Sequence, residues 1–154
     1  MKLTDFVCVE AVTPKLESND RDGVIKELVN ALSLAGKIPK SRFKDIAEAV
    51  IVRENEASTG IGKGVAVPHV KHASIKQVVA VIGCTKDGVD FSSLDKELVY
   101  TVILLLSPEK DPDKHLQAME NIFKNLQKED FRGFLRQAQT SEAIHEVLVD
   151  FCEE

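Results

Sequence analysis

The chain has 154 residues, which suits one domain with a sizeable hydrophobic core. Apolar residues make up 44% of it and charged residues 29%, fractions that exclude a disordered or fibrous chain. The formal net charge is −5, and the lysines and arginines are scattered rather than clustered. This charge pattern argues against nucleic-acid binding through a basic patch.

The sequence shows no feature of export or of membrane insertion. Its N-terminal region lacks a basic segment followed by an apolar core, so no signal peptide is expected. The longest apolar run, Val99 to Leu106, is far too short to span a bilayer. The three cysteines have no paired spacing, which is typical of free thiols in a reducing compartment. We therefore expect a cytoplasmic protein without direct membrane insertion.

The first predicted helix follows a weakly patterned lead-in. Within this lead-in, residues 3–16, the apolar residues 6–9 can form a short strand. Asn19 or Asp20 can cap a helix that ends just before Gly36, a suitable stop residue. Apolar residues recur along this segment at helical spacing, which predicts one buried face.

A second helix is predicted between Ser41 and Arg53. Ser41 can act as its N-cap, and the helix is expected to end near Arg53, before a glycine-rich stretch. The apolar residues that recur at helical spacing are Phe43, Ile46, Ala47, Val50 and Ile51.

Two central strands are expected in the middle of the chain. Val78 to Cys84 is continuously apolar, as is Val99 to Leu106, and such runs are typical of strands buried on both faces. Between them, Lys86-Asp87-Gly88 has the composition of a turn.

The C-terminal part predicts three further helices. Asp111 and Pro112 open the first, as cap and first helical residue; Phe131 to Ala138 forms the second, and Thr140 caps the third. The residues expected on the buried face of the first are Leu116, Met119, Phe123 and Leu126. With helices at both ends and strands between them, residues 1–154 predict a single α/β domain. Its expected architecture is a three-layer sandwich with a mixed central sheet flanked by helices.

The stretch of residues 53–72 concentrates unusual backbone chemistry. Three of the eight glycines lie in it, at Gly60, Gly62 and Gly64. Glycine adopts backbone angles that other residues avoid and allows a ligand to approach the main chain. Successive N–H groups in such a turn can converge on an anion. We therefore expect a phosphate-binding turn here.

A histidine follows this glycine turn at once. Val65 to Val67 predicts a short strand, which Pro68 ends because proline cannot donate to a sheet ladder. If strand geometry holds that far, Val65, Val67 and His69 point to one side. A side chain that titrates near neutral pH then stands at the strand end.

Two more residues complete a candidate catalytic site. His115 lies in the first turn of the helix that follows a central strand, where sites of open α/β sheets gather. The positive helix end disfavours its protonation, so a neutral His115 could share a pocket with His69. Arg53 adds a planar fork that suits two phosphate oxygens. A neutral nucleophile, an arginine clamp and a nest of N–H groups are the parts needed to hold a phosphoryl group on imidazole.

Other ligand classes fit this stretch poorly. A phosphate-binding P-loop requires glycine at position 57 and serine or threonine at position 64, where Ala57 and Gly64 stand. A metal site from His69, His72 and His115 lacks carboxylate or cysteine ligands at a recognisable spacing. No metal and no cofactor is therefore expected.

Glu54 and Glu56 flank the site and are interpreted as loop-shaping residues, since a like charge near a phosphoryl group is unfavourable.

The segment Ser58 to His69, which reads STGIGKGVAVPH, resembles the active-site signature of a known family. This is the fructose/mannitol-type EIIA domain of the bacterial phosphotransferase system, a class that includes the nitrogen-regulatory EIIA proteins. The resemblance extends over the whole chain. It implies a mixed sheet flanked by helices and a phosphoryl group accepted on His69 from phosphorylated HPr or its paralogue. It also implies that Arg53 contacts this group and that His115 is the second active-site histidine.

The resemblance leaves two functions open. In the first, the protein passes the phosphoryl group to the EIIB domain of a fructose/mannitol-type sugar permease. In the second, it is a regulatory module, and phosphorylation of His69 controls which partner it binds. No EIIB-like cysteine domain or membrane domain is present in the sequence, which favours the freestanding regulatory type.

Overall fold

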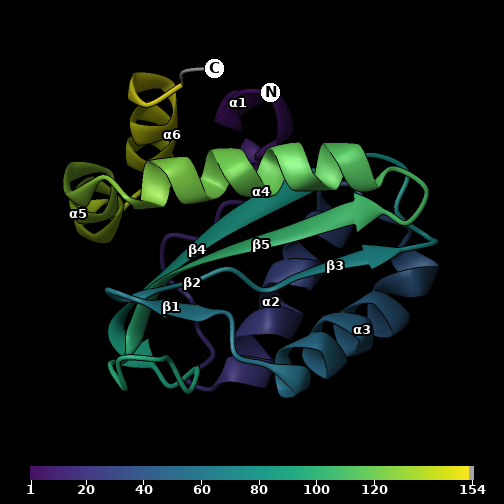
Figure 1. Ribbon diagram of the computed structural model, residues 1–154, viewed down its shortest axis with the longest axis horizontal. Helices are drawn as coiled ribbons and strands as arrows, with labels where there is room; N and C mark the ends of the chain where they lie inside the picture. Colours follow the sequence, from purple (N-terminus) through teal and green to yellow (C-terminus); the bar gives the residue numbers. More distant parts are fainter. Residues whose placement is uncertain (153–154) are drawn as a thin grey trace.

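Helices cover both faces of a central sheet in this protein (Figure 1). The computed structural model describes residues 1–152. Its five-stranded mixed sheet and flanking helices confirm the predicted three-layer α/β architecture. In chain order the helices and strands are α1 (Leu3–Phe6), α2 (Arg21–Leu34), α3 (Phe43–Glu56), β1 (Gly60–Gly62), β2 (Val65–Ala66), β3 (His69–His72), β4 (Val79–Val89), β5 (Val99–Pro108), α4 (Pro112–Leu126), α5 (Glu129–Gln137) and α6 (Ser141–Asp150).

The strand β5 lies in the middle of the sheet. β4 pairs with one side of it in antiparallel orientation, and β2 and β3 pair with the other side in parallel. Val65 is opposite Thr101 and His69 is opposite Leu105, so β2 and β3 keep one register across Pro68. They therefore form a single interrupted strand, and β1 pairs antiparallel with its β2 part.

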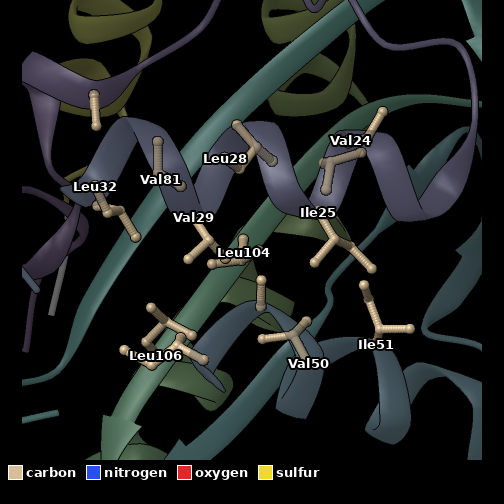
Figure 2. Packing of buried hydrophobic residues seen from close by; sticks show 14 of the residues in the cluster. Val24, Ile25, Leu28, Val29, Leu32, Val50, Ile51, Val81, Leu104 and Leu106 are labelled. Atoms are coloured by element: carbon tan, nitrogen blue, oxygen red, sulfur yellow. The ribbon is translucent and has the colours of Figure 1, made fainter. Parts of the chain in front are cut away.

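Alternate residues of β5 belong to two separate hydrophobic clusters. Val102, Leu104 and Leu106 pack with residues of α2 and α3, as Figure 2 shows for Leu104 and Leu106. Ile103 and Leu105 belong to the cluster that includes α4, α5 and α6 on the opposite face. A strand buried on both faces needs an unbroken apolar run, and the run predicted as a central strand provides it.

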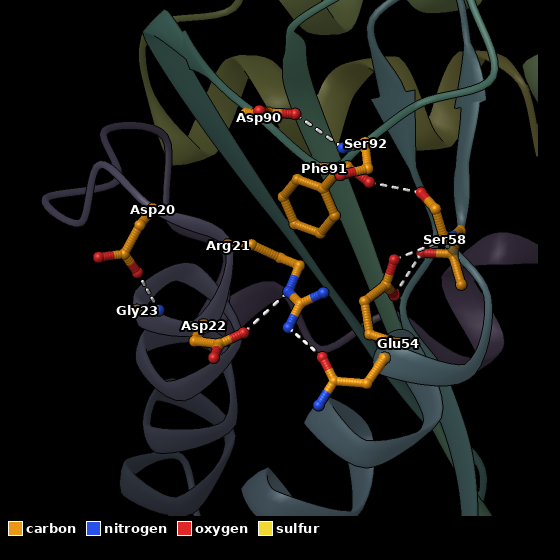
Figure 3. A network of polar contacts seen from close by, with 11 residues as sticks. Asp20, Arg21, Asp22, Gly23, Glu54, Ser58, Asp90, Phe91 and Ser92 are labelled. Atoms are coloured by element: carbon orange, nitrogen blue, oxygen red, sulfur yellow. Dashed lines mark hydrogen bonds and ion pairs between the residues drawn. The ribbon is translucent and has the colours of Figure 1, made fainter. Parts of the chain in front are cut away.

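Polar side chains cap three of the helices where the sequence predicts them. Asp20, Asp111 and Thr140 each accept a hydrogen bond from a backbone N–H in the first turn of α2, α4 and α6. The donors are Gly23, Lys114 and Ala143, at 2.6, 3.2 and 3.1 Å, and Figure 3 shows the first of these contacts. Within residues 1–152 no helix is long and apolar enough to cross a membrane.

The start and end of α3 differ from the prediction. Ser41 does not cap it, because it lies inside a 3₁₀ turn, Lys40–Arg42, and Arg42 occupies the N-cap position. Such tight turns commonly lead into an α-helix. At the other end the helix continues to Glu56, which places Arg53 within its last turn.

The lead-in does not form the predicted strand. Phe6 ends the short helix α1, and Val9 begins a 3₁₀ turn. Val7 makes an isolated bridge to Ala80 of β4. The lead-in nevertheless hydrogen-bonds along the outer edge of β4, for example from Cys8 N to the Ala80 carbonyl at 2.7 Å. The apolar residues here are buried by this edge contact rather than by a regular strand.

The predicted turn at Lys86-Asp87-Gly88 is wrong, since β4 passes through it. The pairing of β4 with β5 is irregular between Cys84 and Val89, where the strand contains a bulge. Gly88 has a φ of 85° and supplies the unusual backbone angle that the bulge requires. Turn-forming residues thus bend a long strand here instead of ending it.

The buried face of α4 agrees only in part with the predicted one, since Leu126 is buried and Met119 and Phe123 are partly buried against the same cluster. Leu116 is 57% exposed, whereas the buried residues of this helix are Ala118, Asn121, Ile122, Asn125 and Leu126. Two of these are asparagines whose amides are satisfied inside the protein: Asn121 Nδ2 donates to the Met1 carbonyl at 2.6 Å, and Asn125 Nδ2 donates to the Asn121 carbonyl at 2.9 Å. An apolar pattern does not reveal a buried stripe that contains amides.

Candidate active site

The interruption between β2 and β3 places His69 at the start of a strand. The Val67 N–H donates to the Thr59 carbonyl at 3.2 Å, and the Pro68 carbonyl accepts from Leu105 N at 3.0 Å. Pairing with β5 then resumes at His69. Val65, Val67 and Leu105, the β5 partner of His69, all belong to the cluster on the α4 side. His69 therefore lies on that face, in line with the predicted alternation.

The hydrogen bond of the His69 ring determines its tautomer. Nδ1 lies 2.7 Å from the Val67 carbonyl oxygen. Because a carbonyl can only accept, Nδ1 must carry the proton in the neutral ring. The lone pair of the imidazole is then on Nε2. A neutral histidine held in this way has one defined nucleophilic nitrogen.

The structure brings His115 beside His69. The two ring centroids are 5.6 Å apart and the planes are inclined by 42°. His115 Nδ1 lies 2.7 Å from the hydroxyl of Ser107, a fully buried residue of β5. Sequence reasoning missed Ser107, although a lone hydroxyl at the end of an apolar strand was a signal for it.

Burial keeps both imidazoles neutral. It is the main cause that lowers the pKa of His69, and the nearby cations of Arg53 and Lys71 lower it further. Burial also lowers the pKa of His115, to about 4, with additional contributions from His69 and Lys71. A neutral His115 was predicted from the helix dipole, but desolvation is the larger cause. Lys71 was missed; its position two residues after His69 on the same strand was the available signal.

The last turn of α3 supplies two charged residues of the site. Arg53 Nη1 donates to the Ala57 carbonyl at 3.0 Å, and its charge acts on His69. Glu54 is buried, with 2% of its surface exposed. Its two carboxylate oxygens accept the N–H and the hydroxyl of Thr59, at 2.6 and 2.7 Å. Figure 3 shows Glu54 reaching the chain next to Ser58, whose hydroxyl donates to the Phe91 carbonyl.

The glycines lie in the β-hairpin that β1 and β2 form. Gly62 and Gly64 have φ angles of 95° and 79°, as the tight turn requires. A Cβ on Gly60 would lie 2.2 Å from the hydroxyl of Ser93, so a close approach also requires glycine there. The Lys63 N–H at the tip donates to Asp95 Oδ2 at 2.9 Å.

The hairpin turn is separated from the histidine pair along the sheet. Val65, the first residue after the turn, precedes His69 by four positions in the same register, a distance of about 13 Å along a strand. Gly62 and Gly64 are thus not brought to the imidazole ring. Instead, Thr59 hydrogen-bonds to Val67, the residue whose carbonyl binds the ring. Phosphate binding by the glycines stays a prediction.

His72 lies apart from the other two histidines. It ends β3 at an odd spacing from His69, which places its side chain on the opposite face. Its Nδ1 accepts a hydrogen bond from Ser74 N at 3.0 Å. Across residues 1–152, no group of three histidine, cysteine, aspartate or glutamate side chains is arranged to hold a metal ion.

Comparisons with known proteins agree with this fold and signature. The family model described as phosphoenolpyruvate-dependent sugar phosphotransferase system, EIIA 2, matches residues 5–150. The chain is 34% identical over 149 residues to the fructose-specific EIIABC component of the phosphotransferase system of Bacillus subtilis. This alignment covers 96% of the chain but only 23% of that longer relative.

A nitrogen regulatory protein of Bradyrhizobium diazoefficiens is 33% identical over 149 residues, with 96% of this chain and 95% of the relative covered. Among solved structures, nitrogen regulatory protein IIA-Ntr from Neisseria meningitidis superposes with a TM-score of 0.83 at 25% identity, covering 94% of this chain and 97% of that one. The family match, these relatives and the shared fold lead to one conclusion. The chain belongs to the EIIA type 2 family of the phosphoenolpyruvate-dependent sugar phosphotransferase system.

Proposed function

We propose that His69 accepts a phosphoryl group from phosphorylated HPr or its paralogue and later gives it to a partner protein. The observation that carries this proposal is the geometry of the His69 ring: its Nδ1–H is held by the Val67 carbonyl, so Nε2 has the free lone pair. Nε2 attacks phosphorus, the phosphorus–nitrogen bond of the donor breaks, and a new bond to Nε2 forms. The donor histidine keeps the electrons of the broken bond.

The neighbouring groups suit the charges that this transfer creates. Positive charge develops on the His69 ring as phosphorus binds, which strengthens the hydrogen bond from Nδ1 to Val67. The phosphoryl oxygens carry negative charge, which the Arg53 guanidinium can meet with two donors. His115 is neutral at pH 7 and can donate one hydrogen bond to the same oxygens. In this proposal His69 is the nucleophile, and Arg53 and His115 stabilise the transferred group.

The acceptor can be of two kinds. In a sugar transport route, the phosphoryl group passes to an EIIB domain of a fructose/mannitol-type permease. The B. subtilis relative, whose name joins EIIA with B and C components, supports this route. In a regulatory route, phosphorylation controls binding to a regulatory protein. The match to nearly the whole length of a nitrogen regulatory protein supports that route. Either route places the protein in the cytoplasm, and we take residues 1–154 as one functional domain.

The phosphorylation step can be tested with purified components. Incubation with phosphoenolpyruvate, enzyme I and HPr is expected to give an acid-labile, base-stable phosphoprotein. His69→Ala should abolish the label, while His72→Ala, on the same strand but the opposite face, should be labelled like the parent. Label that persists in His69→Ala would exclude His69 as the acceptor.

The acceptor requires a separate measurement. The unmodified and phosphorylated forms are titrated against EIIB domains and against candidate regulatory proteins. Transfer of the label to an EIIB domain supports the transport route. A partner that binds only one form supports regulation, and equal affinity of both forms for every partner would exclude it.

A further inference from the structure

A continuous series of hydrogen bonds joins a buried carboxylate to the His69 ring. Glu54 accepts both the N–H and the hydroxyl of Thr59, at 2.6 and 2.7 Å. The Thr59 carbonyl accepts the Val67 N–H at 3.2 Å. The Val67 carbonyl in turn accepts Nδ1–H of His69 at 2.7 Å. Four residues from α3, the signature loop and the interrupted strand are thereby connected in sequence.

The first part of this series is built as a rigid support. Glu54 and Thr59 are 2% and 6% exposed. A buried carboxylate is stable only when its oxygens are hydrogen-bonded, and here both oxygens bind the same residue. Two bonds to one carboxylate hold the backbone N–H and the side chain of Thr59, and so restrain this residue on both sides of its Cα. Loss of the Glu54 carboxylate would remove both restraints on Thr59, the residue whose carbonyl binds Val67.

The second part determines what the ring can bind. On an extended residue N–H and C=O point to the same side, so the Val67 carbonyl points to the β1 side, away from β5. Thr59, the residue just before β1, accepts the hydrogen bond from the Val67 N–H. The Val67 carbonyl accepts the hydrogen bond from the His69 imidazole. The position of Thr59 thus sets the acceptor that selects the His69 tautomer.

Charge gives Glu54 a second effect on the same ring. The charged or titratable groups that face His69 are Arg53 and Glu54 from α3, Lys71 from β3 and His115 from α4. Arg53 and Lys71 lower the pKa of His69, after burial, whereas Glu54 raises it. The positive charges of Arg53 and Lys71 make Nε2 of His69 less basic, and the negative charge of Glu54 offsets part of this effect. A carboxylate whose oxygens face Thr59 does this without facing the phosphoryl oxygens.

We propose that Glu54 is a positioning residue of the phosphorylation site, which holds His69 in the Nδ1–H tautomer through Thr59 and Val67. The proposal rests on the proposed role of His69 as phosphoryl acceptor. It changes the interpretation of Glu54 from a loop-shaping residue to a residue that acts on the nucleophile through two intermediates.

The test uses a variant that keeps the size of Glu54 but removes its charge. In Glu54→Gln, nitrogen NMR of the imidazoles should show a larger Nε2–H population and a lower pKa for His69. Phosphorylation from HPr should slow on the order of tenfold, taking as a guide the effect of altering a group that orients a metal-ligating imidazole. The matched control is Glu56→Gln, which removes the same charge from an exposed position in the same helix turn and should resemble the parent.

Two variants of Thr59 test the same support from its other side. Thr59→Ser keeps both donors to Glu54 and should retain the parental tautomer ratio and rate. Thr59→Val keeps only the N–H donor and should fall between the parent and Glu54→Gln. If Glu54→Gln does not fold, the difference between these two variants decides the proposal by the same NMR measurement.

The outcomes separate this proposal from the proposed function. A parental tautomer ratio and ring titration in Glu54→Gln, with Thr59→Val also like the parent, would overturn the role of Glu54 even if His69 is phosphorylated. Failure to label the parent on His69 would overturn the proposed function, while the imidazole spectra still measure what Glu54 does to the ring.

Discussion

Strand β3 and helix α4 each contribute one histidine to the candidate site, but they hold the two adjacent rings differently. On β3, His69 Nδ1 binds a backbone carbonyl, which can only accept a hydrogen bond. On α4, His115 Nδ1 binds the hydroxyl of Ser107, which can either donate or accept. The His69 tautomer is therefore fixed, whereas the Ser107 hydroxyl can bind either tautomer of the His115 ring by rotating to accept or to donate.

Under the proposed function, this difference suits a division of roles between the two histidines. A nucleophile benefits from one defined lone pair, which the carbonyl enforces on His69. A residue that contacts the phosphoryl group benefits from a hydrogen-bond role that can change. The phosphoryl oxygens accept a hydrogen bond from its ring while the group is bound, and this acceptor is absent before the group arrives. The hydroxyl of Ser107 gives His115 that freedom. The partner of each Nδ1 atom, more than the imidazole itself, distinguishes the two histidines.

The largest expected effect comes from removing the adaptable ring. His115→Ala should still be phosphorylated on His69, but on the order of a hundredfold more slowly, within the range typical of groups that assist proton transfer or charge stabilisation. Quench-flow measurement of transfer from HPr, in both directions, checks this. Unchanged forward and reverse rates would make His115 a structural residue and remove the contrast.

A smaller effect is expected from Arg53→Lys, since Arg53 is the cation whose charge acts on His69. The lysine keeps the charge but loses the planar fork, so transfer should slow on the order of tenfold, since one hydrogen bond to a charged group contributes about 1.5–3 kcal/mol. The thermal unfolding midpoint should remain close to that of the parent. A parental transfer rate in this variant would contradict the clamp role.

Ser107→Ala removes the group that makes the His115 side adaptable. Transfer should slow about fivefold, equivalent to roughly 1 kcal/mol for one neutral hydrogen bond. Ser93→Ala is the matched control, because Ser93 is also buried and its hydroxyl has no hydrogen-bond partner within the described residues. If both variants slow equally, loss of a buried hydroxyl, and not the contact with His115, explains the effect.

The smallest effect is the pH dependence of stability. Both rings have a lowered pKa in the folded protein, and that of His115 is about 4. An unfolded histidine titrates near 6.5, so below this pH the unfolded chain binds more protons than the folded one. The free energy of unfolding should therefore fall as pH decreases from about 6.5 towards 4. Urea unfolding across this range should show a shallower decline in His115→Ala than in the parent.

Sequence reasoning predicted which candidate residues lie near one another better than it predicted their surroundings. His69, Arg53 and His115 could be named because a strand-ending proline, a helix end and a capped helix start are local patterns. The burial of Glu54 could not, because it depends on Thr59 folding back onto α3. The role of Gly60 depends on Ser93, more than thirty positions away. Contacts of this kind arise from tertiary packing, and a single sequence does not contain them as a pattern.

The interruption between β2 and β3 has a further consequence, for strand addition at the β3 edge of the sheet. Unpaired strand edges are templates on which other chains can add and aggregate. Within residues 1–152, β3 has β5 on one side and no strand on the other. It spans only His69–His72, follows Pro68, and exposes Lys71, features that discourage strand addition. The break that makes the Val67 carbonyl available to His69 thus also leaves this edge short and charged, which disfavours strand addition there.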